Sequence, residues 1–301
     1  MTQRWTKLGL IYSPRHDEQY THAAVPIADH ISGDLFKIYF TSRDRSNRSI
    51  TRNLVLDIKK PNEILELGAI PVLVPGNLGE FDDDGAMATW LSKHGGREYL
   101  YYIGWNRGQT VPFRNSIGLA TADKPGEFAR YSPGPILDRT MCEPHFVASC
   151  CVLPSSDKWR MWYLSCTGWR LVDNQPQHRY HIKYAESVDG VHWQRNGVVA
   201  IDYKNENEYA ISRPSVMQDD DCWRMWYSYR GARYRIGYAE SSDGIEWKRR
   251  DPDCCLNVSA SGWDDEMIEY PHVFDHDGSR YMLYNGNGYG KTGFGLAVLE
   301  S

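Results

Sequence analysis

Short runs rich in aromatic and aliphatic residues recur along the whole chain. The clearest pair is WRMWYLS at 159–165 and WRMWYSY at 223–229, with weaker counterparts at 36–42, 98–104 and 280–286. Runs of this length that are rich in Tyr, Trp, Ile and Val predict β-strands. No stretch of the sequence has the period of a long amphipathic helix. The pattern therefore predicts an all-β chain.

A second recurring segment follows each of these strands. IKYAESVDGVHW at 182–193 is nearly repeated as IGYAESSDGIEW at 236–247, and shorter counterparts lie at 52–58, 117–123 and 294–300. Their starts are about 55 to 65 residues apart, which is typical of four-stranded propeller blades. Within them, Ser187–Trp193 and Ser241–Trp247 share the pattern SxDGxxW. We expect a turn in which the Asp accepts backbone N–H groups and the Trp packs beneath the hairpin.

A third segment precedes each pair and predicts five innermost strands, at 21–28, 84–91, 145–153, 209–217 and 266–274. Five repeats predict a five-bladed β-propeller, with four-stranded antiparallel blades around a central channel. The predicted blades span approximately 8–60, 61–128, 136–193, 200–247 and 255–300 within one domain, residues 1–301. Segment 294–300 would complete the ring near the N-terminal strand. The glycine-rich stretch 285–295 predicts a tight hairpin, because it does not join a strand to a helix as a phosphate-binding loop does.

Charge and composition narrow the class of protein. There are 34 Lys and Arg against 39 Asp and Glu, a formal net charge of −5, which argues against nucleic acid as the main partner. A local basic patch remains open at 43–52, although a solvated loop is the simpler interpretation. No apolar run is long enough to span a membrane or resembles a signal peptide. The seven cysteines form no disulfide framework, so we expect a reduced, cytoplasmic chain in which adjacent pairs such as Cys254–Cys255 are buried.

Acids or histidines stand at or just before every predicted inner strand. They are Asp17, Glu18, His22, Asp82, Asp83, Asp84, Glu143, His145, Glu206, Glu208, Asp264, Asp265, Glu266 and Glu269. Convergent carboxylates suit glycoside chemistry, in which one protonated acid assists the leaving oxygen and an ionised partner activates water or attacks the anomeric carbon. We assign Glu143 and Glu208 as acid/base candidates, with Asp83 or Asp84 as the partner carboxylate; ordinary solvated loop charge is the alternative.

Other residues near the predicted channel mouth are candidates for binding a small-molecule or oligosaccharide substrate. They are His22, Trp105, His145, Trp169, Tyr209, Arg213, Glu269 and Tyr270. Aligned on the inner strands, Arg213 matches Ser149 and Tyr270. It could bind a carboxylate or phosphate of the substrate, or pair with a Glu of a neighbouring blade. No ligand spacing specifies a metal site, so we expect no cofactor, with Ca²⁺ as an alternative.

The five repeats, the MWY strands and the YAESxDGxxW hairpins resemble the five-bladed glycoside hydrolase superfamily. Its members include the arabinanase/xylosidase, invertase/levansucrase and mannoside-phosphorylase families. The resemblance covers essentially the whole chain and implies an active site at the channel mouth, with carboxylates from different blades. Glu143 could stand in for the middle-blade acid and Glu208 for the later one. The chain departs from the pattern at blade 1, where His22 lies near the place of an expected Asp.

Three functions follow from these patterns. The leading hypothesis is a carbohydrate-active enzyme, a hydrolase, phosphorylase or transferase acting at a glycosidic centre, with an activated or phosphorylated sugar as one candidate substrate. The second is a catalytically inert sugar-binding propeller, which the altered blade 1 favours. The third is a protein-interaction propeller, although the repeat signatures of that class are absent.

Overall fold

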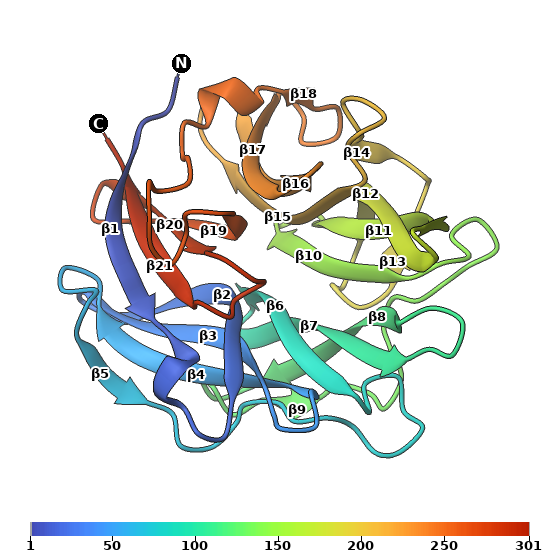
Figure 1. The fold of residues 1–301 in the computed structure, drawn as a ribbon, viewed down its shortest axis with the longest axis horizontal. Helices are drawn as coiled ribbons and strands as arrows, with labels where there is room; N and C mark the ends of the chain where they lie inside the picture. Colours follow the sequence, from blue (N-terminus) through green and yellow to red (C-terminus); the bar gives the residue numbers. More distant parts are fainter. Residues whose placement is uncertain (1, 301) are drawn as a thin grey trace.

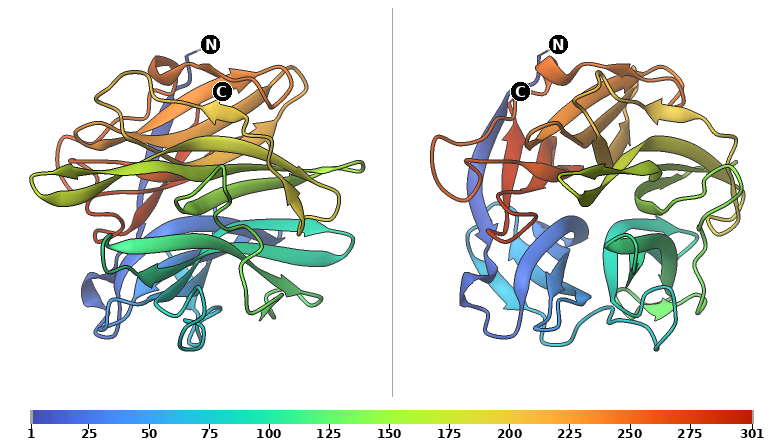
Figure 2. Two further views of the ribbon diagram at one scale, coloured as in Figure 1. Left: turned by 90° about the vertical axis from the view of Figure 1, so that its right-hand side faces the viewer. Right: turned by 45° about the vertical axis from the view of Figure 1, so that its right-hand side comes forward.

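The regular secondary structure of the chain is almost entirely β-strand (Figures 1 and 2). The structure is a computed structural model that describes residues 2–300. Within this range the only helices are two 3₁₀ turns, η1 (Pro14–His16) and η2 (Asp251–Asp253). No helix of the described residues has the length and apolar character needed to cross a membrane. The prediction of an all-β chain is confirmed.

The strands pair in antiparallel groups that follow the sequence repeats and are consistent with propeller blades. We call the groups units 1 to 5. Unit 1 contains β2 (Thr21–Ser32), β3 (Leu35–Arg43), β4 (Ser49–Asp57) and β5 (Ile64–Leu67). Unit 2 contains β6 (Gly85–His94), β7 (Arg97–Arg107), β8 (Phe113–Ala122) and β9 (Ala129–Arg130). Unit 3 contains β10 (Val147–Pro154), β11 (Trp159–Val172), β12 (Gln175–Ser187), β13 (Trp193–Gln194) and β14 (Val199–Ile201).

The last two units close the arrangement. Unit 4 contains β15 (Ala210–Gln218), β16 (Trp223–Arg230), β17 (Tyr234–Ser241) and β18 (Lys248–Arg249). Unit 5 contains β19 (Glu269–His276), β20 (Ser279–Asn285), β21 (Phe294–Leu299) and β1 (Trp5–Tyr12). Strand β1 pairs with β21 in the antiparallel sense, so the N-terminal strand completes the last unit (Figure 1). This confirms the predicted place of segment 294–300, and the stretch 285–295 forms the predicted hairpin between β20 and β21.

The first long strand of each unit faces the middle of the molecule. Strands β2, β6, β10, β15 and β19 contact one another in that order, and β19 contacts β2. These are the five strands that the sequence predicts to be innermost. They bring five segments that are far apart in the chain to one place, which is the arrangement a shared site needs.

Every inner strand carries a β-bulge in its first half or near its middle, where the pairing register shifts. The bulged residues are Val25, Thr89, Ser149, Arg213 and Tyr270. Three of them, Val25, Arg213 and Tyr270, have positive φ angles of 54°, 52° and 56°. Bulges re-aim side chains and are common beside active sites, and left-handed non-glycine residues concentrate at functional positions. The predicted alignment of Arg213 with Ser149 and Tyr270 is confirmed.

The SxDGxxW elements form the expected turns at the outer ends of β12 and β17. Asp189 Oδ1 accepts the backbone N–H groups of Val191 and His192, both at 2.8 Å. Asp243 makes the same pair of contacts one repeat later. The two tryptophans of the motif pack against the buried core. These turns therefore have the structural role that the sequence predicts.

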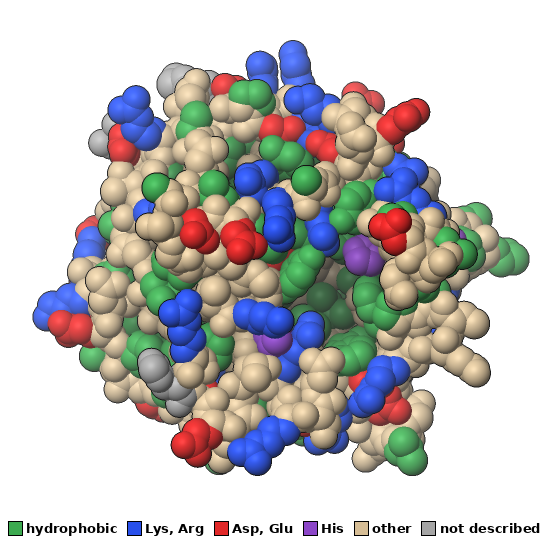
Figure 3. Space-filling view, in the orientation of Figure 1, with side chains coloured by type: hydrophobic (Ala, Val, Ile, Leu, Met, Phe, Trp, Pro, Cys, Tyr) green, Lys and Arg blue, Asp and Glu red, His purple; other side chains and the backbone are tan. Residues whose placement is uncertain are grey.

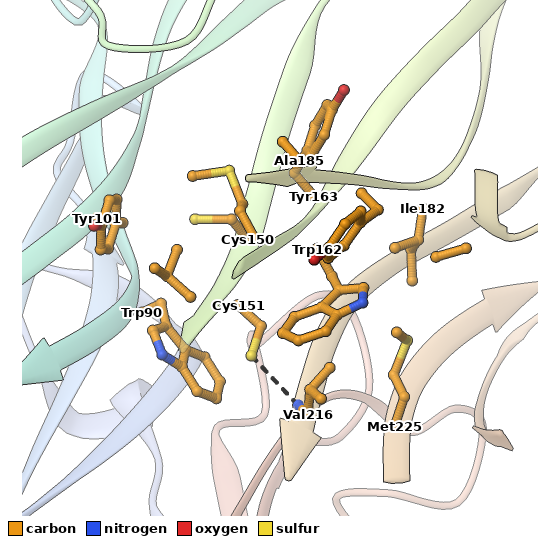
Figure 4. Close-up of a cluster of buried hydrophobic side chains, with 14 of the residues drawn as sticks. Trp90, Tyr101, Cys150, Cys151, Trp162, Tyr163, Ile182, Ala185, Val216 and Met225 are labelled. Carbon is orange, nitrogen blue, oxygen red and sulfur yellow. Dashed lines mark hydrogen bonds between the residues drawn. The ribbon is translucent and has the colours of Figure 1, made fainter. Parts of the chain in front are cut away.

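The core continues from one unit to the next, so the units stabilise each other. In Figure 4, Trp90 and Tyr101 of unit 2 lie beside Cys150 and Cys151 of unit 3. The backbone N–H of Val216 in unit 4 donates to Cys151 Sγ at 3.4 Å. All seven cysteines are free thiols, and Cys150, Cys151 and Cys254 are buried as expected. The prediction that Cys255 is buried is wrong, because this residue lies exposed at the surface after η2.

Candidate functional site

A pocket of about 530 Å³ lies where the inner strands meet, and residues from all five units line it. Its volume suits a small ligand. Figure 3 shows a hollow near the middle of the face that it presents, with apolar side chains inside and Lys and Arg side chains around it. The bulged residues Val25, Ser149, Arg213 and Tyr270 belong to its lining. The bulges therefore position the site directly.

Aromatic side chains form much of the wall. They are Trp105, Phe113, Phe146, Tyr180, Tyr234, Tyr270 and Tyr289. Tyr180 and Tyr234 meet through their hydroxyl groups at 2.5 Å, and the Tyr234 ring lies 6.2 Å from the Tyr270 ring. Trp105 is held at the rim because its Nε1 donates to Ser49 Oγ of unit 1 at 3.1 Å. Rings fixed in this way offer flat faces and polar edges to a ligand.

The charged residues of the lining are all basic. Arg43, Arg107, Arg213 and Arg230 line the pocket, and among the described lining residues there is no Asp or Glu. Arg107 forms an ion pair with Asp84 at 2.8 Å. The other three arginines form no ion pair within residues 2–300. The pocket is therefore locally positive in a chain whose formal net charge is −5.

Arg213 lies at the floor of the pocket and is fully buried. Its guanidinium donates to the carbonyl oxygen of Thr89 and, at 3.1 Å, to that of Pro26. These two carbonyls belong to the bulges of β6 and β2, so Arg213 ties three inner strands together. Burial lowers the pKa of Arg213 to about 10, so the side chain keeps its charge at neutral pH. The proposed pairing of Arg213 with a Glu of a neighbouring unit does not occur.

Arg230 ends β16, the strand next to that of Arg213, and stands among tyrosines. Its guanidinium lies over the rings of Tyr209, Tyr234 and Tyr289, at 5.3, 5.4 and 5.7 Å from their centres. It also donates to the Tyr289 hydroxyl at 2.6 Å. These contacts fix the direction of the guanidinium without neutralising its charge.

Glu269 is an acid that lies behind this wall, near Arg230. Its side chain is fully buried, and neither carboxyl oxygen has a hydrogen-bond partner among the described residues. Burial raises the pKa of Glu269 well above its usual value, and the charge of Arg230 opposes the shift only in part. The raised pKa favours the neutral form of this carboxyl group, which does not cancel the charge of Arg230.

The predicted catalytic acid Glu143 is placed away from the pocket lining, in a network of its own. It accepts hydrogen bonds from Ser165 Oγ at 2.7 Å and Tyr163 OH at 3.0 Å, and it forms an ion pair with Arg195 at 2.9 Å. Burial alone would raise the pKa of Glu143, but the hydrogen bond from Ser165 and the charges of Lys183 and Arg195 outweigh burial and lower it. Glu143 is thus an ionised, paired group.

The other predicted acids are also paired outside the lining. Glu208 forms an ion pair with Arg249 at 2.7 Å. Asp83 accepts from the backbone N–H of Gly79 and from Asn106, and Asp84 pairs with Arg107. The structure therefore does not bring Glu143, Glu208, Asp83 and Asp84 together around one cavity. Their catalytic roles stay predictions.

The paired acids repeat from unit to unit. In each unit a carboxylate pairs with a Lys or Arg of an outer strand or the residue beside it: Asp17–Arg52, Asp82–Arg130, Glu143–Arg195, Glu208–Arg249 and Asp264–Lys7. We call these five pairs the acid clasps. In units 3 and 5 a tyrosine of the second strand, Tyr163 or Tyr284, also donates to the carboxylate. The recurrence of acids along the sequence thus coincides with a recurring stabilising contact.

The predicted binding residues divide into three groups. Trp105, Arg213 and Tyr270 line the pocket, while Tyr209 and Glu269 lie directly behind its wall. His22 faces a smaller neighbouring pocket that also contains Lys291. Burial and the charges of Arg43 and Lys291 lower the pKa of His22 to about 4, so it is neutral at pH 7.

The remaining two candidates do not belong to the pocket lining. Trp169 packs behind it, against Phe113 and Phe146, and His145 is half-buried one residue before Phe146. Within residues 2–300, no cluster of three or more His, Cys, Asp or Glu side chains could hold a metal ion.

Several lining residues were not predicted from the sequence. Arg43 belongs to the basic run 43–52, for which a solvated loop was the simpler interpretation. This interpretation is wrong at both ends, because Arg43 ends β3 at the pocket and Arg52 is buried in β4 beside Asp17. Tyr289 comes from the glycine-rich hairpin and has a φ of 60°. Arg230 ends β16, and nothing in the sequence distinguishes it from other charged residues at strand ends.

Two relatives and several solved structures resemble this chain along nearly its whole length. No protein-family model matches it. It is 42% identical over 299 residues to two Mycobacterium tuberculosis proteins, "Uncharacterized protein Rv1502" and "Uncharacterized protein MT1551", covering 99% of this chain and of each relative. Among solved structures it resembles a glycosyl hydrolase from Bacteroides ovatus, at 12% identity and a TM-score of 0.75, over 99% of this chain and 94% of the other.

Two further structures extend the fold match. One is a thermostable family-43 glycoside hydrolase, 17% identical with a TM-score of 0.67 over 93% of this chain and 88% of the other. The other is the GH32 β-fructofuranosidase BmSUC1 of Bombyx mori, 14% identical with a TM-score of 0.64 over 95% and 62%. At these identities the likeness concerns the fold. The chain belongs to the family of Rv1502 and has the fold of the five-bladed-propeller glycoside hydrolases.

Proposed function

We propose that this protein is carbohydrate-active and holds a sugar in the central pocket, acting at a glycosidic centre. In this proposal units 1 to 5 are the five blades of one propeller domain, and the pocket is the mouth of its central channel. The cyclic contacts among the inner strands support that arrangement. The observation that carries the proposal is a pocket built by all five units and walled by aromatic rings, in a glycoside hydrolase fold.

Binding of a sugar is tested by a thermal-shift screen of neutral, phosphorylated and nucleotide-linked sugars, because a ligand that binds only the folded state raises the melting temperature. The Trp105→Ala variant should weaken binding of any hit by about tenfold, since it removes a ring face and its fixed position. Tyr131→Ala is the matched control, because Tyr131 is an exposed aromatic residue outside the pocket. A screen without any hit, or a hit indifferent to Trp105, would contradict the proposal.

The proposal also assigns catalytic residues. Glu143 and Glu208 are the proposed acid/base pair, with Asp83 or Asp84 as partner, and turnover through them would require a substrate that reaches beyond the described pocket. The test is turnover of an identified ligand by Glu143→Gln and Glu208→Gln variants that remain folded. Loss of turnover with retained binding would support these roles, and full activity in both would exclude them.

A sugar-binding protein without turnover is the second candidate. The observation that favours it is the lack of Asp and Glu among the described residues of the lining. Glycoside hydrolysis usually needs two carboxyl groups flanking the scissile bond. A ligand that binds at the pocket and stays intact after prolonged incubation with the protein would select this candidate.

A further inference from the structure

Arg43, Arg213 and Arg230 line the pocket without a carboxylate at ion-pair distance among residues 2–300, whereas Arg107 pairs with Asp84. Arg43 donates to Asn47 Oδ1 at 3.2 Å, Arg230 donates to the Tyr289 hydroxyl, and Arg213 donates to backbone carbonyls. None of these acceptors is charged. A guanidinium taken out of water without an anionic partner is costly for a folded protein. By contrast, the acid clasps give other partly buried basic groups a carboxylate.

Unsatisfied polar atoms gather at the same place. Arg213 Nε, Arg230 Nε, Ser212 Oγ and His178 Nε2 are buried and have no hydrogen-bond partner among the described residues. All four residues line the pocket. Buried polar atoms are nearly always paired in folded proteins, so a cluster of unpaired ones needs an explanation. Both Arg Nε atoms are donors, and the serine hydroxyl can donate, which suits an acceptor-rich ligand group.

We propose that the sugar bound in this pocket carries an anionic substituent, a phosphoryl or carboxylate group, held by Arg43, Arg213 and Arg230. The inference rests on the proposed function and names its class of ligand. Arg guanidinium groups bind planar or tetrahedral oxyanions through paired N–H donors. The aromatic wall then faces the sugar ring. The pocket volume of about 530 Å³ favours a small charged sugar over a charged polymer.

The test uses four probes that differ in their anionic group: glucose, glucose 1-phosphate, glucuronate and inorganic phosphate. Binding to the full-length protein is measured by calorimetry at low salt. Arg43→Gln and Arg230→Gln are the variants of choice, because Arg213 also ties three inner strands together and its replacement could unfold the chain. Arg97→Gln is the control, since Arg97 is exposed, pairs with Asp123 and lies outside the pocket lining.

At least one charged sugar should bind more than tenfold tighter than glucose. Each pocket variant should weaken that binding about 10- to 100-fold, the loss expected for a hydrogen bond to a charged group. Binding of glucose should change little, and Arg97→Gln should match the wild type. The ratio of glucose 1-phosphate to glucuronate affinity identifies the anionic group.

A second readout needs no ligand. Because Arg43 is desolvated and has no carboxylate partner among the described residues, Arg43→Gln should not lower the melting temperature. Equal affinity for glucose and all charged probes would overturn the anionic class while leaving sugar binding intact. Charged probes indifferent to both variants would overturn it as well. Arginine-dependent binding of inorganic phosphate, with no sugar binding better, would support the anion site and contradict the carbohydrate function.

Discussion

The acid clasps and the central pocket are opposite solutions to the same problem of burying charge. In the clasp of unit 3, Glu143 has two cations and two hydroxyl groups around it, so the charges compensate one another. In the pocket, Arg213 and Arg230 have neutral hydrogen-bond partners, and burial raises the pKa of Glu269 behind the wall and so disfavours its charged form. Paired charges such as those of the clasps stabilise the fold, whereas unpaired charges such as those of the pocket can bind a ligand. An unpaired buried charge is therefore a better indicator of a binding site than the presence of charge alone.

The largest expected effect breaks a clasp. Glu143→Gln removes the carboxylate and leaves Arg195 and Lys183 without a partner, so we expect the free energy of unfolding to fall by about 3 kcal/mol or more. Urea unfolding at pH 7 measures this loss. Exposed Glu63→Gln is the control and should change stability by less than about 0.5 kcal/mol. If Glu143→Gln is as stable as the wild type, the clasp does not stabilise the fold.

Glu269→Gln should raise the free energy of unfolding as the pH rises, because it removes a carboxyl group whose charged form burial disfavours. The folded-state pKa of Glu269 is raised above its unfolded value of 4.5, so the folded state binds more protons than the unfolded state above that pH. The contribution of Glu269 to stability is therefore fully present below pH 4.5 and is lost as the pH rises, by up to about 1.4 kcal/mol per pH unit.

The variant should lack this loss, so its stability should gain on that of the wild type as the pH rises above 4.5. Urea unfolding of both proteins at several pH values measures the divergence. Parallel curves for the two proteins would mean that Glu269 ionises in the folded state, and would also make it a partner for Arg230.

His178, a residue of the pocket lining, makes the stability of the fold depend on pH below 6.5. Burial and the charge of Arg230 lower its pKa to about 4 from 6.5, so the unfolded chain binds more protons within that window. Stability is therefore unaffected above pH 6.5 and falls as the pH drops towards 4. In a His178→Gln variant the loss between pH 7 and pH 4.5 should be smaller by about 2 kcal/mol. Replacement of the exposed His94 should leave the wild-type dependence unchanged, and an unaltered dependence in His178→Gln would refute the prediction.

The fold was predictable because its signals are local and repeated. The strands with the MWY pattern, the SxDGxxW turns and the alignment of Arg213 with Tyr270 each appear in several copies, so one copy supports the next. The distinction between clasp and pocket was not predictable in this way. Glu143 and its partner Arg195 are 52 residues apart, and their pairing depends on how an outer strand packs over an inner one.

The pocket residues were hard to predict for a related reason. Arg43 and Arg230 look like any charged residue at a strand end, and Tyr289 looks like a turn residue. That these three residues line one pocket follows only from the contacts among the five inner strands. A sequence shows that acids recur before strands, but it does not show whether a Lys or Arg of another strand forms an ion pair with each of them.

The smallest expected effect tests a single part of one clasp. Tyr163 donates to Glu143 at 3.0 Å from the second strand of unit 3, whereas unit 1 has Phe40 at the matching place of its repeat. Tyr163→Phe should therefore cost about 1 kcal/mol, the net value of one hydrogen bond, because Ser165 and the two cations still hold the carboxylate. Urea unfolding measures the cost, and the double variant with Glu143→Gln should lose less than the sum of the two single losses if the groups act together. Strict additivity would show that the hydroxyl group of Tyr163 does not act through the carboxylate of Glu143, and that the ion pair holds this clasp without it.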